Sequence, residues 1–292
     1  MFYLIQKRSW STFITAFLLL FLWGLPGCKR TPSSAYTFFV AGHTYGHPAR
    51  KAPGLHPPFV EDFAFLQKQE GLACGVFTGD IVYYSRDTFW DQVDREIADL
   101  EVPVHFAVGN HDEGARSPFK ERYGPTYYHF EQNGDLFLIL NPGLKGWNIA
   151  DEQLAFLRKQ LSRANRYHNI FLFFHQLLWW TPDNGYRKWA PNTTVGRVPN
   201  INFWPEIMPM LYEVDRPVYC FAGDIGGNLT KVGLFADHEK NVHLLASGMG
   251  NLRDDNYLIV EVGMDKQVQI KVRWLQKKTL QSIDWKNISL SP

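Results

Sequence analysis

Short apolar runs that end in polar loops constrain the fold of this chain more than any other feature of its sequence. Continuous runs only a few residues long are typical of buried strands. Five of them are followed by side chains that bind metals or protons: His43, Asp80, Asn110 with His111, His175 and Asp224. Helical spacing of apolar residues appears over 58–69, 88–100 and 151–165, and Asn133-Gly134 predicts a hairpin turn. We therefore expect an α/β fold, a two-sheet β-sandwich flanked by helices.

The loop at 110–113, with the sequence Asn-His-Asp-Glu, brings several polar side chains together. An amide, an imidazole and two carboxylates are costly to desolvate in one loop unless they bind something. Asp80 lies in a second loop of this kind, at the end of the preceding apolar run. Two such strand-end loops indicate a metal site at the edge of an α/β sheet. The alternative is that Asp80 and Asn110 only shape turns, which Gly-Asp and Gly-Asn sequences favour.

The first 27 residues have the organisation of an export signal peptide. Lys7 and Arg8 form a positive segment, and residues 13–25 form an uncharged, mainly apolar run that is short for a membrane-spanning helix. Cys28 follows Leu-Pro-Gly, which resembles the lipobox of bacterial lipoproteins and predicts a lipid on Cys28. The alternative is an uncleaved N-terminal anchor. Either arrangement predicts a domain at the cell envelope, tethered to a membrane and facing the periplasm or the exterior.

The segment after the signal peptide is expected to hold one folded domain. Residues 28–36 are interpreted as a tether, residues 37–276 as the domain and residues 277–292 as a C-terminal tail. The chain has 292 residues, 45% of them hydrophobic, which is enough to bury a substantial core. Its net charge of +1 predicts no binding to nucleic acid through bulk charge. Cys74 and Cys220 both lie in apolar runs, where a disulfide and two buried free thiols remain alternatives.

The order of the polar loops resembles that of the calcineurin-like metallophosphoesterases. The matching residues are Gly79-Asp80, Gly109-Asn110-His111-Asp112 and the strand-end His175. The resemblance covers about 37–276, and its most specific part is the Gly-Asn-His-Asp sequence about 30 residues after Gly-Asp. It implies a two-sheet sandwich with helices outside, one or two divalent ions of manganese, iron or zinc, and hydrolysis of phosphoric esters.

The resemblance also implies a role for each matching residue. Asp80 would bridge two metals, and Asn110 and His175 would bind the second of them. A metal-activated hydroxide would attack phosphorus, because metals lower the pKa of bound water to about 7. His111 would assist the leaving group as a general acid, and Asp112 would orient His111.

Two motifs depart from the family pattern. At the first motif the family has Asp-x-His, and this chain has His-Thr-Tyr from residue 43. At the last motif the family has Gly-His-x-His, and this chain has Gly-Asp-Ile-Gly from residue 223. A carboxylate in place of an imidazole still ligates a metal, so the second metal position keeps Asp80, Asn110, His175 and Asp224. The first metal position keeps only His43 and Asp80.

Two functions fit these residues. The first is a metal-dependent phosphomonoesterase or phosphodiesterase, with a phosphoester substrate that includes glycan- or lipid-linked esters. The second is an inactive protein of the same fold that binds a glycan or a partner protein, and the altered first and last motifs favour it. The complete Gly-Asn-His-Asp sequence favours the enzyme. Residues 176–204 hold four Trp, which either face the substrate or pack this loop onto the sheet, and Tyr45 and Tyr83 are either further ligands or loop packing.

Overall fold

The computed structural model describes residues 34–228 and 231–285. The chain divides into two compact units, 1–32 and 33–292, and the described residues all belong to the second. The expected signal peptide, Cys28 and the greater part of the expected tether lie outside the described residues. Within those residues, no helix is both long enough and apolar enough to cross a membrane.

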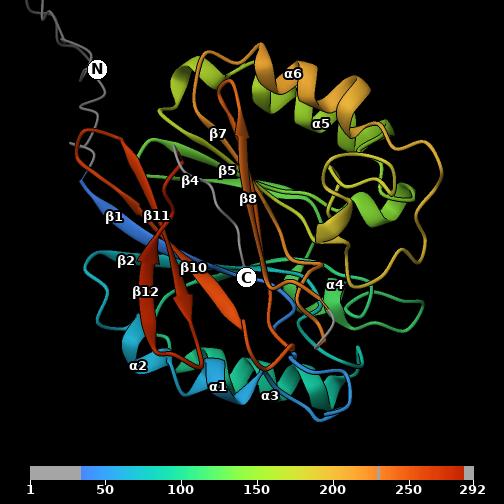
Figure 1. Ribbon diagram of the computed structural model, residues 1–292, viewed down its shortest axis with the longest axis vertical. Coiled ribbons are helices and arrows are strands. Elements are labelled where there is room, and N and C mark those ends of the chain that lie inside the picture. Colours follow the sequence, from blue (N-terminus) through green and yellow to red (C-terminus); the bar gives the residue numbers. More distant parts are fainter. Residues whose placement is uncertain (1–33, 229–230, 286–292) are drawn as a thin grey trace, which may run out of the picture. The chain divides into compact units, whose positions relative to one another are not determined.

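Within the described residues, six strands form a first sheet, called sheet A here (Figure 1). In chain order they are β1 (Tyr36–Ala41), β2 (Leu72–Thr78), β3 (Val104–Ala107), β10 (Asn256–Val262), β11 (Val268–Trp274) and β12 (Thr279–Ser282). Their order across the sheet is β12-β11-β10-β1-β2-β3. β1, β2 and β3 are parallel, and β10 pairs antiparallel with β1. β12 lies beyond residue 276, where we expected the domain to end, and it pairs antiparallel with β11.

Sheet B also contains six strands in the described part of the chain. They are β4 (Tyr128–Gln132), β5 (Asp135–Ile139), β6 (Ile170–Phe173), β7 (Val218–Ala222), β8 (Leu234–Glu239) and β9 (Val242–Ser247). The order is β4-β5-β6-β7-β9-β8, with β5, β6, β7 and β9 parallel. The β4–β5 hairpin turns at Asn133 and Gly134, which both have positive φ as the Asn-Gly sequence predicts.

Short helices cover the outer faces of the two sheets. They are α1 (Pro57–Val60), α2 (Phe63–Leu66), α3 (Asp87–Ala98), α4 (Phe119–Tyr123), α5 (Asp151–Leu161) and α6 (Met208–Tyr212). Single turns of other helix types are η1 (Pro142–Lys145), η2 (Ala164–Arg166), η3 (Arg187–Trp189) and η4 (Phe203–Ile207). Figure 1 shows α1, α2 and α3 along one side of the domain and α5 and α6 along the opposite side. The two-sheet sandwich flanked by helices is therefore confirmed.

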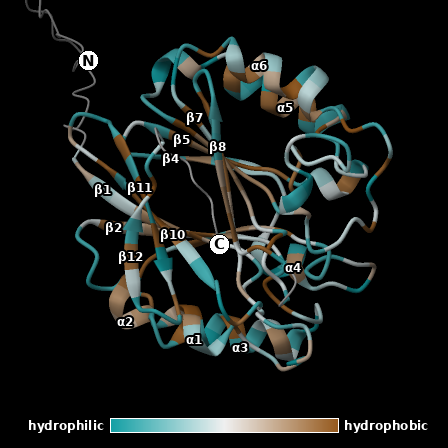
Figure 2. Cartoon of the chain, in the orientation of Figure 1, coloured by the Kyte–Doolittle hydropathy of each residue, from teal (hydrophilic) through white to brown (hydrophobic). Residues whose placement is uncertain are grey.

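Alternation of side chains along the strands divides the core into layers. On β1, Phe38 and Val40 face the space between the sheets, whereas Phe39 and Ala41 pack with the helices outside sheet A. Between the sheets, Phe38 meets rings from sheet B edge-on, with centroids 5.0 Å from Phe171. Figure 2 shows hydrophobic residues along the central strands and a mixture of hydrophobic and hydrophilic residues along the helices.

The single helix expected over 58–69 is instead two short helices, α1 and α2. The chain turns between them at Asp62, whose carboxylate points into the fold and accepts hydrogen bonds from Arg273 and Tyr257. The apolar spacing was right, since Phe59 and Phe63 are buried on one side. The Asp62 carboxylate is bound by Arg273, 211 residues away in sequence, and local spacing carries no signal for this contact.

The cysteines of the domain are free thiols rather than a disulfide. Cys74 lies between the sheets, and Cys220 lies on the outer face of sheet B, so the two side chains belong to different layers. Burial raises the pKa of the Cys74 thiol to about 12 and also raises the pKa of Cys220. Both thiols are therefore inert packing groups near neutral pH.

Candidate metal centre

The polar loops lie at the carboxyl ends of parallel strands in both sheets. β1 leads to His43 and β2 to Asp80, while β6 leads to His175 and β7 to Asp224. His175 Nε2 lies 3.4 Å from Asp80 Oδ1 and 3.8 Å from Asp224 Oδ1. His43 Nε2 lies 3.7 Å from Asp80 Oδ2. These four side chains, each at most 2% exposed, form one buried polar cluster, called the candidate centre below.

Two glycines allow the sheet edges to approach closely enough for this meeting. A Cβ on Gly223 would lie 2.0 Å from the Thr78 carbonyl oxygen, so β7 and β2 could not end side by side with any larger residue there. Gly79 has φ +84°, and a Cβ on it would lie 2.5 Å from His175 Nδ1. The packing of the centre thus requires glycine before both Asp80 and Asp224, and before Asp80 the positive φ requires it as well.

The same strand-end geometry places two non-glycine residues in the left-handed region. His43 has φ 51° and Asp80 has φ 52°. Residues other than glycine rarely adopt this conformation, and such strain concentrates at functional sites. The backbone of the centre is therefore held by its surroundings in a conformation that the isolated loops would not prefer.

Both imidazoles are oriented by backbone carbonyl groups. His175 Nδ1 lies 2.9 Å from the Thr78 oxygen, and His43 Nδ1 lies 2.9 Å from the Met249 oxygen. A carbonyl oxygen can only accept, so Nδ1 donates in each ring and Nε2 points toward the carboxylates. This is the orientation that histidine ligands adopt in metal sites.

The charges of the centre favour a cation beside His175. Burial alone would lower the pKa of His175, but the carboxylates of Asp80 and Asp224 outweigh it and raise the pKa. Burial alone would raise the pKa of Asp80, but His175 and His43 outweigh it and lower the pKa. Burial lowers the pKa of His43 to about 4, so this ring is neutral. Positive charge, whether a proton or a metal ion, is stabilised at His175 Nε2.

Asp224 gives the clearest sign that these residues suit a divalent metal. Its side chain is fully buried, and neither Oδ1 nor Oδ2 accepts a hydrogen bond within the described residues. Burial disfavours the charged form of Asp224 and raises its pKa to about 7. This effect exceeds the opposing effect of the backbone N–H groups of Asn192 and Thr193, which favour the charged form. A buried carboxylate without hydrogen bonds is costly, and a bound cation removes that cost. His175 Nε2 also lacks a hydrogen-bond partner among the described residues.

The side chains converge without forming a finished coordination sphere. Ligand atoms around a tetrahedral cation lie roughly 3.3 to 3.6 Å apart, close to the spacing of His175 Nε2 and Asp80 Oδ1 at 3.4 Å. Within residues 34–228 and 231–285, however, there is no group of three or more His, Cys, Asp or Glu side chains whose arrangement could hold a metal ion. The pairwise distances show that His43, Asp80, His175 and Asp224 meet at one place.

Asn110 and His111 lie in the loop after β3, next to the loop that carries Asp80. The backbone N–H of His111 donates to Asp80 Oδ1 at 3.1 Å, which fixes the loop after β3 against the loop after β2. The side chain of Asn110 is exposed, so of the predicted ligands it is the one on the solvent side. The ring of His111 is half-buried, and its Nδ1 donates to the Tyr83 carbonyl oxygen at 2.8 Å.

Asp112 does not orient His111 in the way that the family resemblance implies. Its Oδ1 accepts hydrogen bonds from the backbone N–H groups of Ile81 and Val82, and its Oδ2 accepts one from Gly109. The carboxylate is fully buried between the two loops, so it ties their backbones together rather than contacting the imidazole. The Tyr83 carbonyl orients His111 instead.

The first metal position remains poor in ligands. Tyr45 packs between His43 and His111, with ring centroids 4.3 Å and 5.0 Å away. Burial and the nearby Asp80 raise the pKa of Tyr45 further above its ordinary value, so it stays a neutral phenol. Gly226 offers no side chain. Of the residues expected there, the structure brings together His43 and Asp80.

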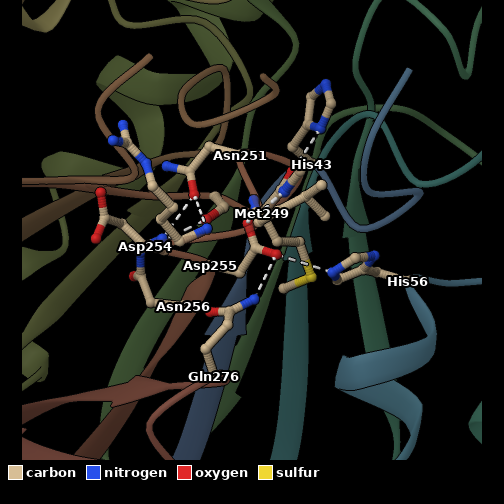
Figure 3. A network of polar contacts seen from close by, with 12 residues as sticks. His43, His56, Met249, Asn251, Asp254, Asp255, Asn256 and Gln276 are labelled. Atoms are coloured by element: carbon tan, nitrogen blue, oxygen red, sulfur yellow. Dashed lines mark hydrogen bonds and ion pairs between the residues drawn. The ribbon is translucent and has the colours of Figure 1, made fainter. Parts of the chain in front are cut away.

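The motif comparison did not identify two features of the centre. Asn192 comes from the Trp-rich segment; its backbone N–H donates to the Asp224 carbonyl oxygen and its Oδ1 accepts from Gly227. The Trp side chains of that segment pack against the outer face of sheet B. Met249 follows β9 and supplies the carbonyl that holds His43 (Figure 3). A backbone carbonyl has no sequence signature, but a polar loop after the apolar run 242–247 was a signal available in the sequence.

Comparisons with known proteins agree with this fold. The calcineurin-like phosphoesterase family matches residues 10–228. Among solved structures, a purple acid phosphatase, PPD1, from yellow lupin (Lupinus luteus) seeds has a TM-score of 0.60 at 13% identity, over 86% of this chain and 53% of that chain. The chain thus spans about half the length of the lupin phosphatase, and the likeness supports the fold alone.

A second solved structure is a conserved uncharacterized protein of Streptococcus pneumoniae TIGR4, described as a predicted phosphoesterase. It has a TM-score of 0.39 at 12% identity, over 86% of this chain and 98% of that chain. Curated protein sequences contain no match to this chain. The family match extends over most of the sequence and ends just after Asp224, past every polar loop of the centre. The chain belongs to the calcineurin-like phosphoesterase family, whose members are phosphoric ester hydrolases that use divalent metals.

Proposed function

We propose that this chain hydrolyses phosphoric monoesters or diesters at a cation site made by Asp80, Asn110, His175 and Asp224. One observation carries the proposal: the Asp224 carboxylate is fully buried, lacks hydrogen-bond partners among the described residues, and lies 3.8 Å from the unpartnered His175 Nε2. A buried carboxylate in this state is costly to ionise, and a bound cation removes that cost.

The residues around the cation site would divide the chemistry between them. A bound divalent cation supplies Lewis acidity, neutralising charge on phosphoryl oxygens and acidifying water. Asp80, in the loop after β2, would be a ligand of the cation. His111 donates a proton to the departing oxygen, and its ring is aimed by the Tyr83 carbonyl. Little else is required, because phosphoryl transfer depends mainly on positioning and charge neutralisation.

We propose one tightly bound cation, with manganese, iron or zinc as the candidates. The second metal position offers nitrogen and oxygen ligands together, a set that suits these ions. The first position has His43 and Asp80 as its side chains, and Tyr45 remains protonated beside them. An ion at the first position would therefore bind more weakly than one between Asp80, His175 and Asp224.

We also propose that the domain works outside the cytoplasm, held at a membrane by a lipid on Cys28. The support is the apolar segment at 13–25 and the Leu-Pro-Gly-Cys sequence that follows it. The substrate would then be a phosphoester of the cell envelope or periplasm, including glycan- or lipid-linked esters.

Metal analysis followed by an ester screen tests the proposal. The full-length protein, purified in detergent, should carry about one divalent ion per chain and hydrolyse aryl phosphate monoesters or diesters in added Mn²⁺. His175→Ala should lose both properties. His105→Ala is the matched control, because this half-buried imidazole stacks on Phe130 at 3.7 Å, away from the centre. Metal without turnover, in wild type and with every ester, would favour the inactive binding protein instead.

A further inference from the structure

Asp255 is a buried carboxylate outside the motifs of the family. Its Oδ1 accepts hydrogen bonds from the backbone N–H groups of Gly250, at 2.6 Å, and Leu252, at 3.1 Å. Its Oδ2 accepts hydrogen bonds from His56 Nε2 and Gln276 Nε2, each at 2.9 Å. Figure 3 shows Asp255 between the loop that carries Met249 and the side chain of His56. A carboxylate with this many donors fixes the elements that carry them.

The first set of contacts leads to the ring of His43. Asp255 holds Gly250 N–H, and the neighbouring carbonyl, that of Met249, accepts the hydrogen bond from His43 Nδ1. Gly250 is tightly enclosed, since a Cβ on it would lie 2.8 Å from the Gly46 oxygen and 2.9 Å from the Gly227 oxygen. The loop after β9 is thus wedged between the loops after β1 and β7, and Asp255 anchors it.

The second set of contacts leads to the backbone of the same histidine. His56 donates to Asp255 through Nε2, and its backbone N–H donates to the Thr44 oxygen at 2.7 Å. Gly46 N–H in turn donates to the His43 oxygen at 3.0 Å. Asp255 therefore braces both the ring of His43 and the strained turn from which that ring projects.

We infer that Asp255 is a positioning residue for His43, one that fixes its ring in the Nδ1–H tautomer with Nε2 directed at Asp80. The inference rests on the proposed function only for its effect on turnover. With the Met249 carbonyl held in place, Nδ1 must donate, and the lone pair of the neutral ring lies on Nε2. A loosened carbonyl removes that preference, because the two neutral tautomers then differ little in energy.

Asp255→Asn is the perturbation that tests this role. Asparagine has the same shape and keeps one oxygen for the N–H groups of Gly250 and Leu252. It loses the negative charge that strengthens these hydrogen bonds and turns an NH2 group toward the donors of His56 and Gln276, so the anchor is weakened. Asp254→Asn is the matched control, since it makes the same change one residue earlier and Figure 3 places Asp254 on the far side of Asp255 from His56. Thermal unfolding confirms that each variant is folded.

The tautomer is read from long-range ¹H–¹⁵N spectra of metal-free, full-length protein labelled at histidine nitrogens, with His43→Gln assigning the signal. Wild type and Asp254→Asn should show His43 as the Nδ1–H form, and Asp255→Asn should show a mixture. In Mn²⁺, Asp255→Asn should lower kcat for an aryl phosphate about 10- to 100-fold, as the loss of an outer partner of a ligand does.

The outcomes separate this inference from the proposed function. An Nε2–H tautomer in wild type overturns the inference even if no variant folds. A folded Asp255→Asn protein with the wild-type tautomer and wild-type kcat overturns it as well. A tautomer shift in Asp255→Asn, in a protein that hydrolyses no ester, supports the inference and refutes the proposed function.

Discussion

Replacing Asp224 by asparagine should stabilise the metal-free protein and destabilise the metal-loaded one. Without a cation, the Asp224 carboxylate is buried and accepts no hydrogen bond within the described residues, and burial outweighs the attraction of His175, so its charge opposes folding. Asparagine keeps the shape and removes the charge. With a cation, the carboxylate is a ligand, and the wild type gains stability that Asp224→Asn gains only in small part.

The magnitude follows from the pKa of Asp224. Burial raises this pKa from 3.8 to about 7, and a rise of about three units corresponds to roughly 4 kcal/mol of destabilisation above pH 7. The asparagine amide also lacks hydrogen-bond partners at this position, which reduces the gain in folding stability by about 1–3 kcal/mol. We expect a net gain of about 1–3 kcal/mol for metal-free Asp224→Asn at pH 8.

The sign of the pH dependence provides an internal check. A carboxyl group with a raised folded pKa takes up its proton before the unfolded chain does as pH falls. Its penalty is therefore full above about pH 7, shrinks as pH falls, and is gone below its unfolded pKa of 3.8. The advantage of Asp224→Asn over wild type should accordingly be much smaller at pH 5 than at pH 8.

Denaturant unfolding followed by Trp fluorescence measures both effects. In EDTA at pH 8 the variant should be the more stable protein. In Mn²⁺ at about 1,000 times its Kd, wild type should gain roughly 4.1 kcal/mol, more than the advantage of the variant in EDTA, and the order should reverse. If Asp224→Asn is less stable than wild type in EDTA, or if Mn²⁺ stabilises both equally, Asp224 is not an uncompensated ligand and the reasoning is wrong.

Other predictions concern the fold and its tether. Asp62→Asn should lower the free energy of unfolding by about 3–5 kcal/mol in chemical denaturation, because Arg273 donates to both of its oxygens in a buried pair. His111→Ala should lower kcat about 10²- to 10⁴-fold with little change in stability, and most for poor leaving groups. Asp112→Ala should instead lower the melting temperature, because three backbone N–H groups lose their acceptor. The unfolded chain should titrate two thiols if Cys28 carries a lipid and three if it does not.

The strand framework was predictable because strand ends coincide with changes of composition. The boundaries of β1 match the apolar run at residue 36 and the polar loop after residue 41. Parallel strands of one sheet direct their carboxyl ends to the same edge, so the meeting of His43 with Asp80 and of His175 with Asp224 follows from topology once the strands are known. The residues of the centre could be predicted from the sequence for the same reason.

What sequence reasoning missed depends on contacts between distant segments. The helix expected over 58–69 is divided at Asp62, which pairs with Arg273, and the local sequence around either residue gives no sign of the other. The orienting role expected of Asp112 belongs to the Tyr83 carbonyl, and a backbone group carries no residue-type signal. Asp255 directly precedes a buried strand, whereas the recognised loops follow one, so the strand-end pattern did not include it.

The most direct test is an anomalous diffraction map from crystals of the protein grown with Mn²⁺. A single strong peak about 2.0–2.3 Å from Asp80, His175 and Asp224 is the predicted result. Full manganese occupancy at a different place, or these three side chains unligated in saturating Mn²⁺, would contradict the assignment of the centre.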